Sequence, residues 1–426
     1  MTHPRIGLST CPTTSIWVVG GGITGCLVAL RLARAGFDVC LHEDSSNLGG
    51  VLTDVVIDGE SWLRGCQYIQ PGRLAEAGFP VPSADRIRLF ANRVASATYT
   101  PGEVLMAQGC EGPATRERVA DMAQILDAHL DSENARQRIA AYPAAVQGAM
   151  DLTLRNGGLD PGEVWGPSIV GLQMARVFFP GQEAETSQLK QCSPALDALI
   201  GVAPASSGAL VGLPEAGYSE WFARIHSELL SAGVRVHLDS RVRLRARDAS
   251  VEVLGSADCR STVIGGVWCS SPTPLHSFMT SDNRLMNQHV YHSYWHLDAV
   301  APHGFEDHYV QFFGHPAGII RATSYAMQNE ARVVVEAIHP SKDGALRLDP
   351  DHVLSASRHL GLDIGSVRMH HGALNFPTVG VRDRHNLDKL ASNLRKHQWI
   401  GGGWVHYGRA RKLQIISAGL VELWDA

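Results

Sequence analysis

The first part of the chain alternates between short continuous apolar runs and a helical repeat of apolar residues. Residues Ile16–Val19 form an unbroken apolar run, which is typical of a buried parallel strand. Residues 26–35 then place apolar side chains at helical spacing and end at Gly36, and residues 39–42 form a second apolar run. This pattern predicts a strand–helix–strand unit with two parallel strands.

Glycines fill the turn between the first predicted strand and the helix, in the pattern Gly20-x-Gly22-x-x-Gly25. Gly20 permits a tight turn, Gly22 lets backbone amides approach a pyrophosphate, and Gly25 lets the helix pack closely on the strand. Ile23 and Thr24 belong to the same predicted helix N-terminus, whose partial positive charge favours phosphates. The segment therefore predicts a dinucleotide-binding loop.

An acidic residue ends the second predicted strand. Glu43 stands 18 residues beyond Gly25, where a carboxylate accepts hydrogen bonds from both ribose hydroxyls of an adenosine. A carboxylate at this place disfavours a 2′-phosphate, so FAD or NAD is expected rather than NADP. Asp44 follows directly and is included in the predicted cofactor-binding set.

The pattern of apolar and polar residues divides much of the remaining chain into two predicted segments. Residues 73–207 carry helical stretches, at 116–131 and 135–154, and are predicted to be a helical insertion. Residues 276–384 contain the β-branched and aromatic runs HYVQFF, GIIRATSY and ARVVVEAI, which predict short strands of an antiparallel sheet.

A second glycine pair follows the acid after a short gap. Ser46-Asn47-Leu48-Gly49-Gly50 leads through Val51 into the segment VLTDVVIDGESWLRGCQYI, which is predicted to be a hairpin. This order of acid, glycine pair and hairpin resembles the FAD-binding half of glutathione-reductase-type flavoproteins, and most closely the amine-oxidase and UDP-galactopyranose-mutase branch. The resemblance implies FAD as the cofactor, with Gly49, Gly50 and Val51 close to its pyrophosphate and ribityl chain.

Two later segments extend the resemblance. Residues 213–242 match the family's turn, amphipathic helix and strand, after which the backbone of Val242 would lie against the adenine. Residues 399–404, WIGGGW, precede a predicted helix at 411–423, and in relatives this strand and its glycines, here Gly402 and Gly403, close over the flavin.

These blocks give a predicted fold and domain organisation. The fold is expected to be α/β, with a Rossmann-like FAD-binding domain, an inserted helical segment and an antiparallel-sheet substrate domain. The FAD-binding domain is assigned to 16–72, 208–275 and 385–426, the helical insertion to 73–207 and the substrate-binding sheet to 276–384.

The resemblance also suggests residues near the substrate. Arg321, in GIIRATSY, corresponds to an arginine that contacts substrate phosphates in the mutases, and it could hold a carboxylate or a phosphate. Trp404 and Tyr325 are candidate aromatic walls of the pocket. Two positions depart from the mutases, because Gln67 replaces a histidine near the flavin and Gly403 replaces a second phosphate-binding arginine.

No metal ligands are predicted. His292 and His296 are four residues apart, but VYHSYWHL alternates like a strand, and neither a cysteine nor an acid pattern completes a site nearby. The eight cysteines form no CxxC pair and are expected to be reduced and mostly buried.

Composition narrows the class of partner. The net charge is −5 and no basic patch stands out, so a nucleic-acid partner is not indicated. No apolar run approaches the ~20 residues that a membrane span needs, and the first fifteen residues lack the pattern of a signal peptide, so a cytoplasmic location is expected. The oligomeric state stays open.

Three functions remain compatible with the sequence. The first is an FAD-dependent oxidoreductase of amine-oxidase-like architecture, which oxidises a C–H next to nitrogen in a small substrate by hydride transfer to flavin N5. The second is a redox-neutral flavoenzyme that acts on a nucleotide sugar, as UDP-galactopyranose mutases do. The third is a non-catalytic FAD-binding protein, and the fold alone does not choose among them.

Overall fold

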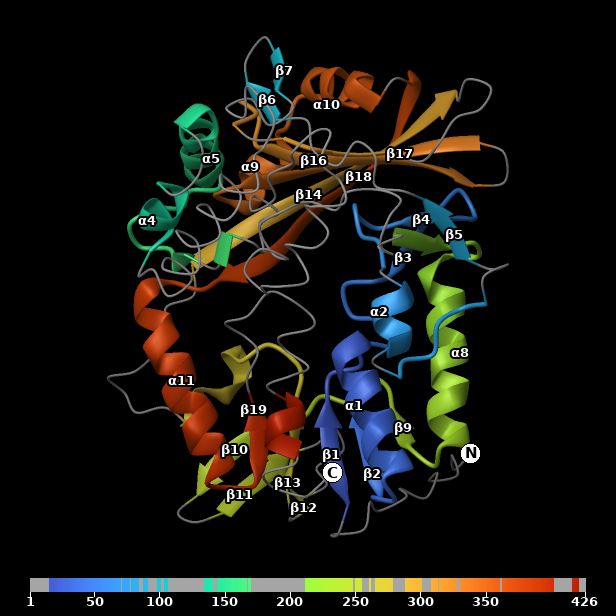
Figure 1. Cartoon of the computed structure of the whole chain (residues 1–426), viewed down its shortest axis with the longest axis vertical. Helices are drawn as coiled ribbons and strands as arrows, with labels where there is room; N and C mark the ends of the chain where they lie inside the picture. Colours follow the sequence, from blue (N-terminus) through green and yellow to red (C-terminus); the bar gives the residue numbers. More distant parts are fainter. Residues whose placement is uncertain are drawn as a thin grey trace, which may run out of the picture.

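A computed structural model describes residues 15–105, 134–169 and 211–401, each with short gaps, and residues 416–420. Two lobes are visible, a parallel sheet with its helices below and an antiparallel sheet above (Figure 1). This is the α/β organisation that the sequence predicts, with a Rossmann-type sheet and a separate antiparallel sheet.

The lower lobe is built on a five-stranded sheet in the order β19-β13-β1-β2-β9, with parallel pairing. Its strands are β1 (Ile16–Val19), β2 (Val39–His42), β9 (Arg235–His237), β13 (Gly265–Trp268) and β19 (Trp399–Gly401). Helices α1 (Ile23–Arg34) and α8 (Gly217–Ser231) belong with one face of this sheet to a common core. The predicted strand–helix–strand unit is therefore confirmed.

The other face of the parallel sheet is covered by a small antiparallel sheet. Strands β10 (Arg243–Arg247), β11 (Ser250–Leu254) and β12 (Arg260–Ser261) form it, and helix α11 (Val381–Arg395) and the 3-10 helix η3 (Thr273–Phe278) lie nearby. Trp17, Trp268 and Trp399 meet the leucines of α11 in this second core.

The upper lobe is a five-stranded antiparallel sheet in the order β15-β16-β17-β14-β18. Its strands are β14 (Gln288–Val300), β15 (His308–Gln311), β16 (Ile319–Met327), β17 (Glu330–His339) and β18 (Asp363–Thr378). Helices α9 (Lys342–Leu346) and α10 (Pro350–Ser357) and the 3-10 helix η5 (Arg358–Leu360) accompany it. The segments HYVQFF, GIIRATSY and ARVVVEAI thus provide strands, as their β-branched and aromatic content predicts, and VYHSYWHL does so as its alternation predicts.

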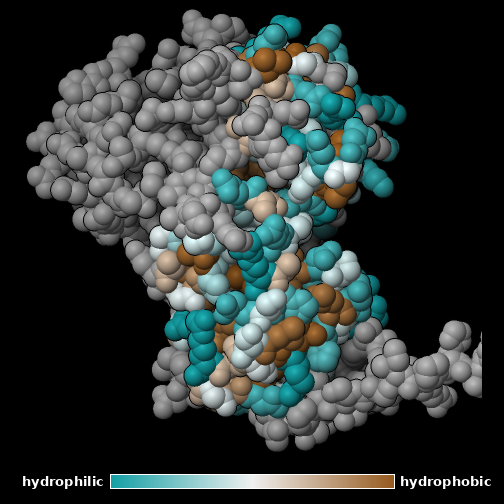
Figure 2. Space-filling view, turned by 90° about the vertical axis from the view of Figure 1, so that its right-hand side faces the viewer, coloured by the Kyte–Doolittle hydropathy of each residue, from teal (hydrophilic) through white to brown (hydrophobic). Residues whose placement is uncertain are grey.

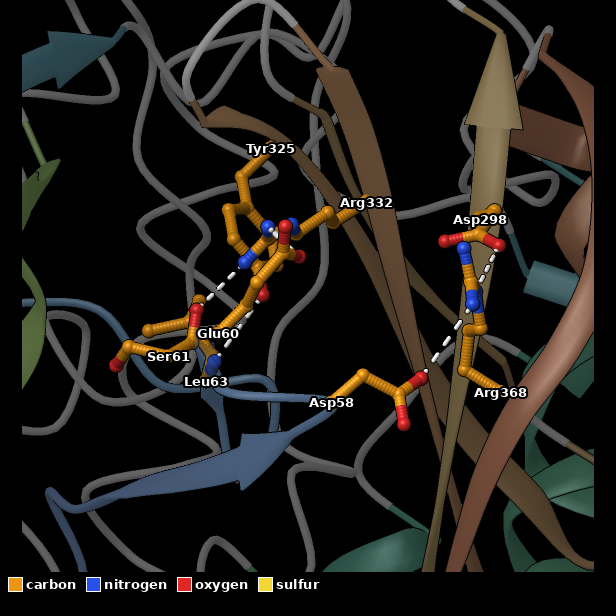
Figure 3. Close-up of polar contacts among 8 residues, drawn as sticks. All are labelled: Asp58, Glu60, Ser61, Leu63, Asp298, Tyr325, Arg332 and Arg368. Carbon is orange, nitrogen blue, oxygen red and sulfur yellow. Dashed lines mark hydrogen bonds and ion pairs between the residues drawn. The ribbon is translucent and has the colours of Figure 1, made fainter.

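The hairpin of β3 (Asp54–Ile57) and β4 (Glu60–Leu63) reaches from the lower lobe to the upper sheet (Figure 3). Arg332 of β17 donates to the Ser61 carbonyl at 2.6 Å, and its guanidinium lies 4.4 Å from the centroid of the Trp62 ring. Arg368 of β18 pairs with Asp58 and Asp298. These contacts fix how the dinucleotide loop and the antiparallel sheet face each other.

The segment predicted as a helical insertion also contains strands. Its described part includes helices α4 (Ala135–Ile139) and α5 (Ala144–Asn156), but also β5 (Ile87–Phe90), β6 (Thr98–Thr100) and β7 (Glu103–Leu105), and α2 (Pro71–Glu76) runs into it. Strand β5 pairs with β8 (Val211–Pro214). The alternation of apolar and polar residues in Ile87-Arg88-Leu89 explains why this segment is a strand and not a helix. The predicted helix at 116–131 lies outside the described residues.

None of the helices in the described parts is long and apolar enough to cross a membrane. On the face shown in Figure 2, the described surface is a mosaic of hydrophilic and hydrophobic residues.

Candidate functional site

The turn after β1 has the geometry of a dinucleotide-binding loop. Gly20 has a φ of +105°, and its amide donates to the carbonyl of His42 at 2.8 Å. A Cβ on Gly25 would lie 1.8 Å from the Gly20 carbonyl oxygen, so only glycine allows helix α1 to start this close to β1. Packing within the protein therefore accounts for two of the three glycines.

Gly22 is different, because no contact within the described protein requires it to be glycine. Its φ of −71° and ψ of 177° are open to any residue, and an added Cβ would lie 3.9 Å from its nearest neighbour, the Cα of Gly50. It is the N-cap of α1, and no side chain among the described residues caps this helix end. The first amides of α1 thus open onto a space that a side chain on Gly22 would partly fill.

The second glycine pair lies against the first loop. The Gly49 amide donates to the Gly21 carbonyl at 2.9 Å, and Gly22 and Gly49 form an isolated parallel bridge. Gly49 and Gly50 have φ values of +126° and +62°, which favour glycine. Two backbone loops without side chains therefore line the space at the N-terminus of α1. We call this arrangement of Gly20–Gly25 with Gly49–Gly50 the glycine cradle.

Glu43 stands at the edge of the glycine cradle with its carboxylate almost buried. One oxygen accepts from the Gly21 amide at 2.6 Å, and the other accepts from the Ser45 amide and hydroxyl at 2.9 and 2.7 Å. A carboxylate has about four lone-pair sites, so ribose hydroxyls still find acceptor capacity here. The acid is thus oriented before any ligand arrives.

The remaining predicted cofactor residues differ in exposure. Ile23 is buried in the core of α1, and Thr24 is half-buried at the helix start. Asp44 is exposed beside Arg241 at 3.5 Å, and Val51 is 56% exposed. The side chain of Val242 is buried in the second core. The predicted residues Gly402, Gly403 and Trp404 lie outside the described residues.

The hairpin end brings a second group of residues toward the antiparallel sheet. A Cβ on Gly65 would lie 2.6 Å from the ring of Tyr294, and the thiol of Cys66 donates to the Val334 carbonyl at 3.3 Å. Gln67 is half-buried, and its carbonyl accepts from the hydroxyl of Tyr218 at 3.0 Å. The turn that carries Gln67 is thus fixed between the two lobes.

Arg321 lies in the same region, but its guanidinium is already engaged. Its Nε donates to one oxygen of Glu336 at 2.6 Å, and His292 Nδ1 donates to the other oxygen at 2.6 Å. Glu336 is fully buried and Arg321 is 8% exposed. We call Arg321, Glu336 and His292 the buried triad. The predicted strand around Arg321 is confirmed, while its expected contact with substrate stays a prediction.

The buried triad holds Glu336 in its charged form. Burial raises the pKa of Glu336, but the charge of Arg321 and the hydrogen bonds from His292 and Arg321 outweigh it and bring the pKa down to about 2. Beside this triad, burial and the charge of Glu336 raise the pKa of Tyr294. Tyr294 is therefore a neutral phenol at physiological pH.

Tyr325 has a structural contact. Its hydroxyl accepts from the Leu63 amide of β4 at 3.1 Å, and the side chain is 1% exposed within the core shared with α1 (Figure 3). Burial raises its pKa. The structure thus places this predicted wall residue between the sheet and the hairpin.

The sequence analysis missed Glu336. A lone carboxylate in the strongly apolar run ARVVVEAI was the available signal, since a buried carboxylate needs a cationic partner. The partner could not be named, because Arg321 and His292 come from two neighbouring strands.

A pH dependence of stability follows from Glu336. A carboxylate whose pKa falls from 4.5 to about 2 on folding stabilises the native state above pH 4.5, and this contribution is lost as the pH falls toward 2. We expect the wild type to lose more unfolding free energy than Glu336→Gln between about pH 6 and about pH 3. Denaturant unfolding at both pH values measures this, and equal losses in the two proteins would contradict the assignment.

Comparison with known proteins supports the fold. Residues 18–76 match the model of an NAD(P)-binding Rossmann-like domain. A reduced UDP-galactopyranose mutase superposes with a TM-score of 0.67 at 14% identity, covering 97% of this chain and 96% of that one. No curated protein sequence matches.

Two further solved structures share the arrangement. Putrescine oxidase bound to putrescine gives a TM-score of 0.54 at 15% identity, covering 95% of this chain and all of that one. A CLA-producing fatty acid isomerase from P. acnes gives 0.56 at 14% identity, covering 99% and 100%. The chain has the fold of these enzymes. At such low identity the likeness concerns the fold and not the reaction.

Proposed function

We propose that this protein is an FAD-dependent oxidoreductase of amine-oxidase-like architecture. It would oxidise a C–H next to nitrogen in a small substrate by hydride transfer to flavin N5. The observation that carries the proposal is the glycine cradle, in which Gly22 is a glycine that no described protein contact requires. Binding of a diphosphate to the amides of α1 would explain why position 22 has no side chain.

FAD, when bound, would supply the two-electron acceptor. The amides at the start of α1 would hold its diphosphate, Glu43 would accept from the adenosine ribose, and Gly49 and Gly50 would let the chain pass close to it. The turn of Gly65 and Gln67 and the antiparallel sheet would close the other side and exclude water.

The pairing of Arg321 favours a substrate without a diphosphate. Arg321 and Glu336 neutralise each other, the neighbouring Tyr294 is a neutral phenol, and Arg64 is the other described cation whose charge acts on Tyr294. A nucleotide sugar brings two phosphates that need cationic partners. A small amine, with or without a single carboxylate, fits this balance better.

The test is an anaerobic titration of the purified full chain followed by its visible spectrum. Bleaching of a bound flavin by an amine or an amino acid, with recovery on admission of air, is the expected result. A protein that cannot be loaded with FAD would overturn the cofactor, and a loaded protein that no amine reduces would overturn the substrate class. A flavin that no substrate reduces or perturbs would indicate the non-catalytic alternative.

A mutase-like activity is the second candidate, because the superposition on the reduced UDP-galactopyranose mutase covers nearly the whole of both chains. In that case UDP-sugars would perturb the spectrum of the reduced protein, and turnover would require prior reduction without consuming the reductant. The oxidase requires neither condition.

Glu43 provides a direct test of cofactor binding. We expect Glu43→Gln to weaken FAD binding by about ten- to a hundredfold, because a charged acceptor of a hydrogen bond contributes about 1.5–3 kcal/mol. Flavin fluorescence during titration of the apoprotein measures the affinity. Glu220→Gln is the control, since Glu220 is an exposed carboxylate on α8 that pairs with exposed Arg224. Equal losses in both variants would contradict the role of Glu43.

A further inference from the structure

Three potential metal ligands lie on one face of the parallel sheet, at its β9 edge (Figure 1). Cys40 and His42 alternate along β2 and so share a face, and His237 is the register partner of His42 on β9. Their thiol sulfur and imidazole nitrogens lie within 4.8 Å of one another. We propose that Cys40, His42 and His237 form a binding site for a zinc-like divalent cation.

His42 is the strongest indication of a metal site, because it is a buried imidazole in which one ring nitrogen has no hydrogen-bond partner. It is 5% exposed, and its Nδ1 pairs with the hydroxyl of Ser240 at 3.0 Å. Among the described residues Nε2 has no hydrogen-bond partner. A buried polar atom without a partner is costly, and a cation on Nε2 would supply the missing interaction.

The hydrogen bond between His42 and Ser240 also suits a metal ligand. Metal-binding histidines usually donate their second N–H to an oxygen, which fixes the tautomer. With Nδ1 donating to Ser240, the lone pair of His42 is on Nε2.

The thiol of Cys40 has a cationic donor beside it. Arg235 Nε donates to the Cys40 sulfur at 3.3 Å, and Asp38 holds the same guanidinium at 2.7 Å. Cys40 is fully buried and belongs to the second core.

One thiolate and two imidazoles are a donor set that suits zinc. Zinc bonds of ~2.0–2.3 Å require ligand atoms about 3.3–3.7 Å apart, so the three groups must draw together by about 1 Å. The rings of His42 and His237 lie nearly parallel with their centroids 4.7 Å apart, and His237 is half-buried on the edge strand. Water would complete the coordination from the open edge.

A cation bound here would link β9 to β2 next to Glu43, the acid that is proposed to bind the ribose. The Glu43 amide donates to the His237 carbonyl at 2.9 Å, and the Ser240 amide donates to the Glu43 carbonyl at 2.8 Å. We therefore assign the cation a structural role, and zinc should raise the thermal unfolding midpoint by several degrees.

The test uses the full chain without a histidine tag, dialysed against zinc and analysed for bound metal. We expect one zinc per chain, and with cobalt in its place a sulfur-to-cobalt charge-transfer band. His237→Ala and Cys40→Ser should bind at least about a hundredfold more weakly, and Ser240→Ala about ten- to a hundredfold more weakly. His385→Ala, which removes an exposed histidine of α11, is the control and should bind as the wild type does.

The proposal fails if the folded wild type takes up no zinc, or if His237→Ala retains wild-type affinity. Should the buried Cys40→Ser variant not fold, the cobalt spectra of the wild type and His237→Ala decide. A sulfur band that His237→Ala loses supports the site, and a wild type without that band overturns it. Bound FAD does not enter the test, because metal content is measured independently of the flavin.

Discussion

Replacing Gly22 by alanine is expected to abolish tight FAD binding and leave the protein folded. The backbone at Gly22 is extended, and the nearest described atoms to its added Cβ are Gly50 Cα at 3.9 Å and the Gly49 carbonyl oxygen at 4.0 Å, so the apoprotein has room for a methyl group. The same methyl group would stand where a diphosphate approaches the first amides of α1. We expect the affinity to fall by roughly a hundredfold or more, about 3 kcal/mol, with the unfolding free energy changed by less than about 0.5 kcal/mol.

Two other glycines make this result specific. Gly25→Ala should lose fold and cofactor together, because its Cβ would overlap the Gly20 carbonyl oxygen at 1.8 Å. Gly148→Ala, in helix α5 with nothing within 4 Å of the added atom, should be neutral or slightly stabilising. Flavin content and thermal unfolding of the three variants check the set. A Gly22→Ala protein that retains full FAD affinity would remove the observation on which the proposed function rests.

The parts of the fold that could be predicted from the sequence are those set by local chemistry. A stretch of 28 residues contains the turn at Gly20–Gly25, the strand pair around it and Glu43. Each of these features therefore restricts the conformation of the next one along the chain. Strand alternation was equally informative in the upper lobe, where the segment with His292 and His296 is a strand, as its pattern indicated. Gly49 and Gly50 indicated the second loop, and their backbone angles favour glycine.

Long-range pairing set the limits of that prediction. Arg321 was recognised as a cation on a strand, but its neutralisation by Glu336 depends on the register between β16 and β17, which includes an irregularity at this point. Tyr325 was recognised as an aromatic near the pocket, but its hydrogen bond to Leu63 joins residues 262 positions apart. Residue types and strand patterns do not contain these registers.

The metal-ligand cluster shows the same limit. Cys40 and His42 are two residues apart on a strand, which a sequence reader can note, but His237 comes almost 200 residues later. Only the pairing of β2 with β9 brings it opposite His42. The sequence analysis therefore found neither the buried triad nor the proposed cation site, because both depend on the pairing of strands that are far apart in the sequence.

Removing the charge of Glu336 is expected to cause a large loss of stability. Glu336→Gln leaves Arg321 in a buried site without its anion, and breaking one partner of a buried pair costs about 3–5 kcal/mol. Since a domain of ordinary stability has about 5–15 kcal/mol in total, the midpoint of denaturant unfolding should fall sharply. Glu220→Gln, which breaks the exposed pair with Arg224 on α8, should cost less than about 1 kcal/mol.

The double variant Arg321→Met with Glu336→Leu separates the structural role of Arg321 from a functional one. Removing both charges leaves no uncompensated ion, so we expect it to recover most of the stability that Glu336→Gln loses. A stable double variant that binds FAD and oxidises substrate normally would show that Arg321 serves only the core. A stable, FAD-loaded double variant with a greatly raised KM would show that Arg321 also contacts the substrate. If the double variant is no more stable than Glu336→Gln, the charge balance of the buried triad is not what holds the two strands together.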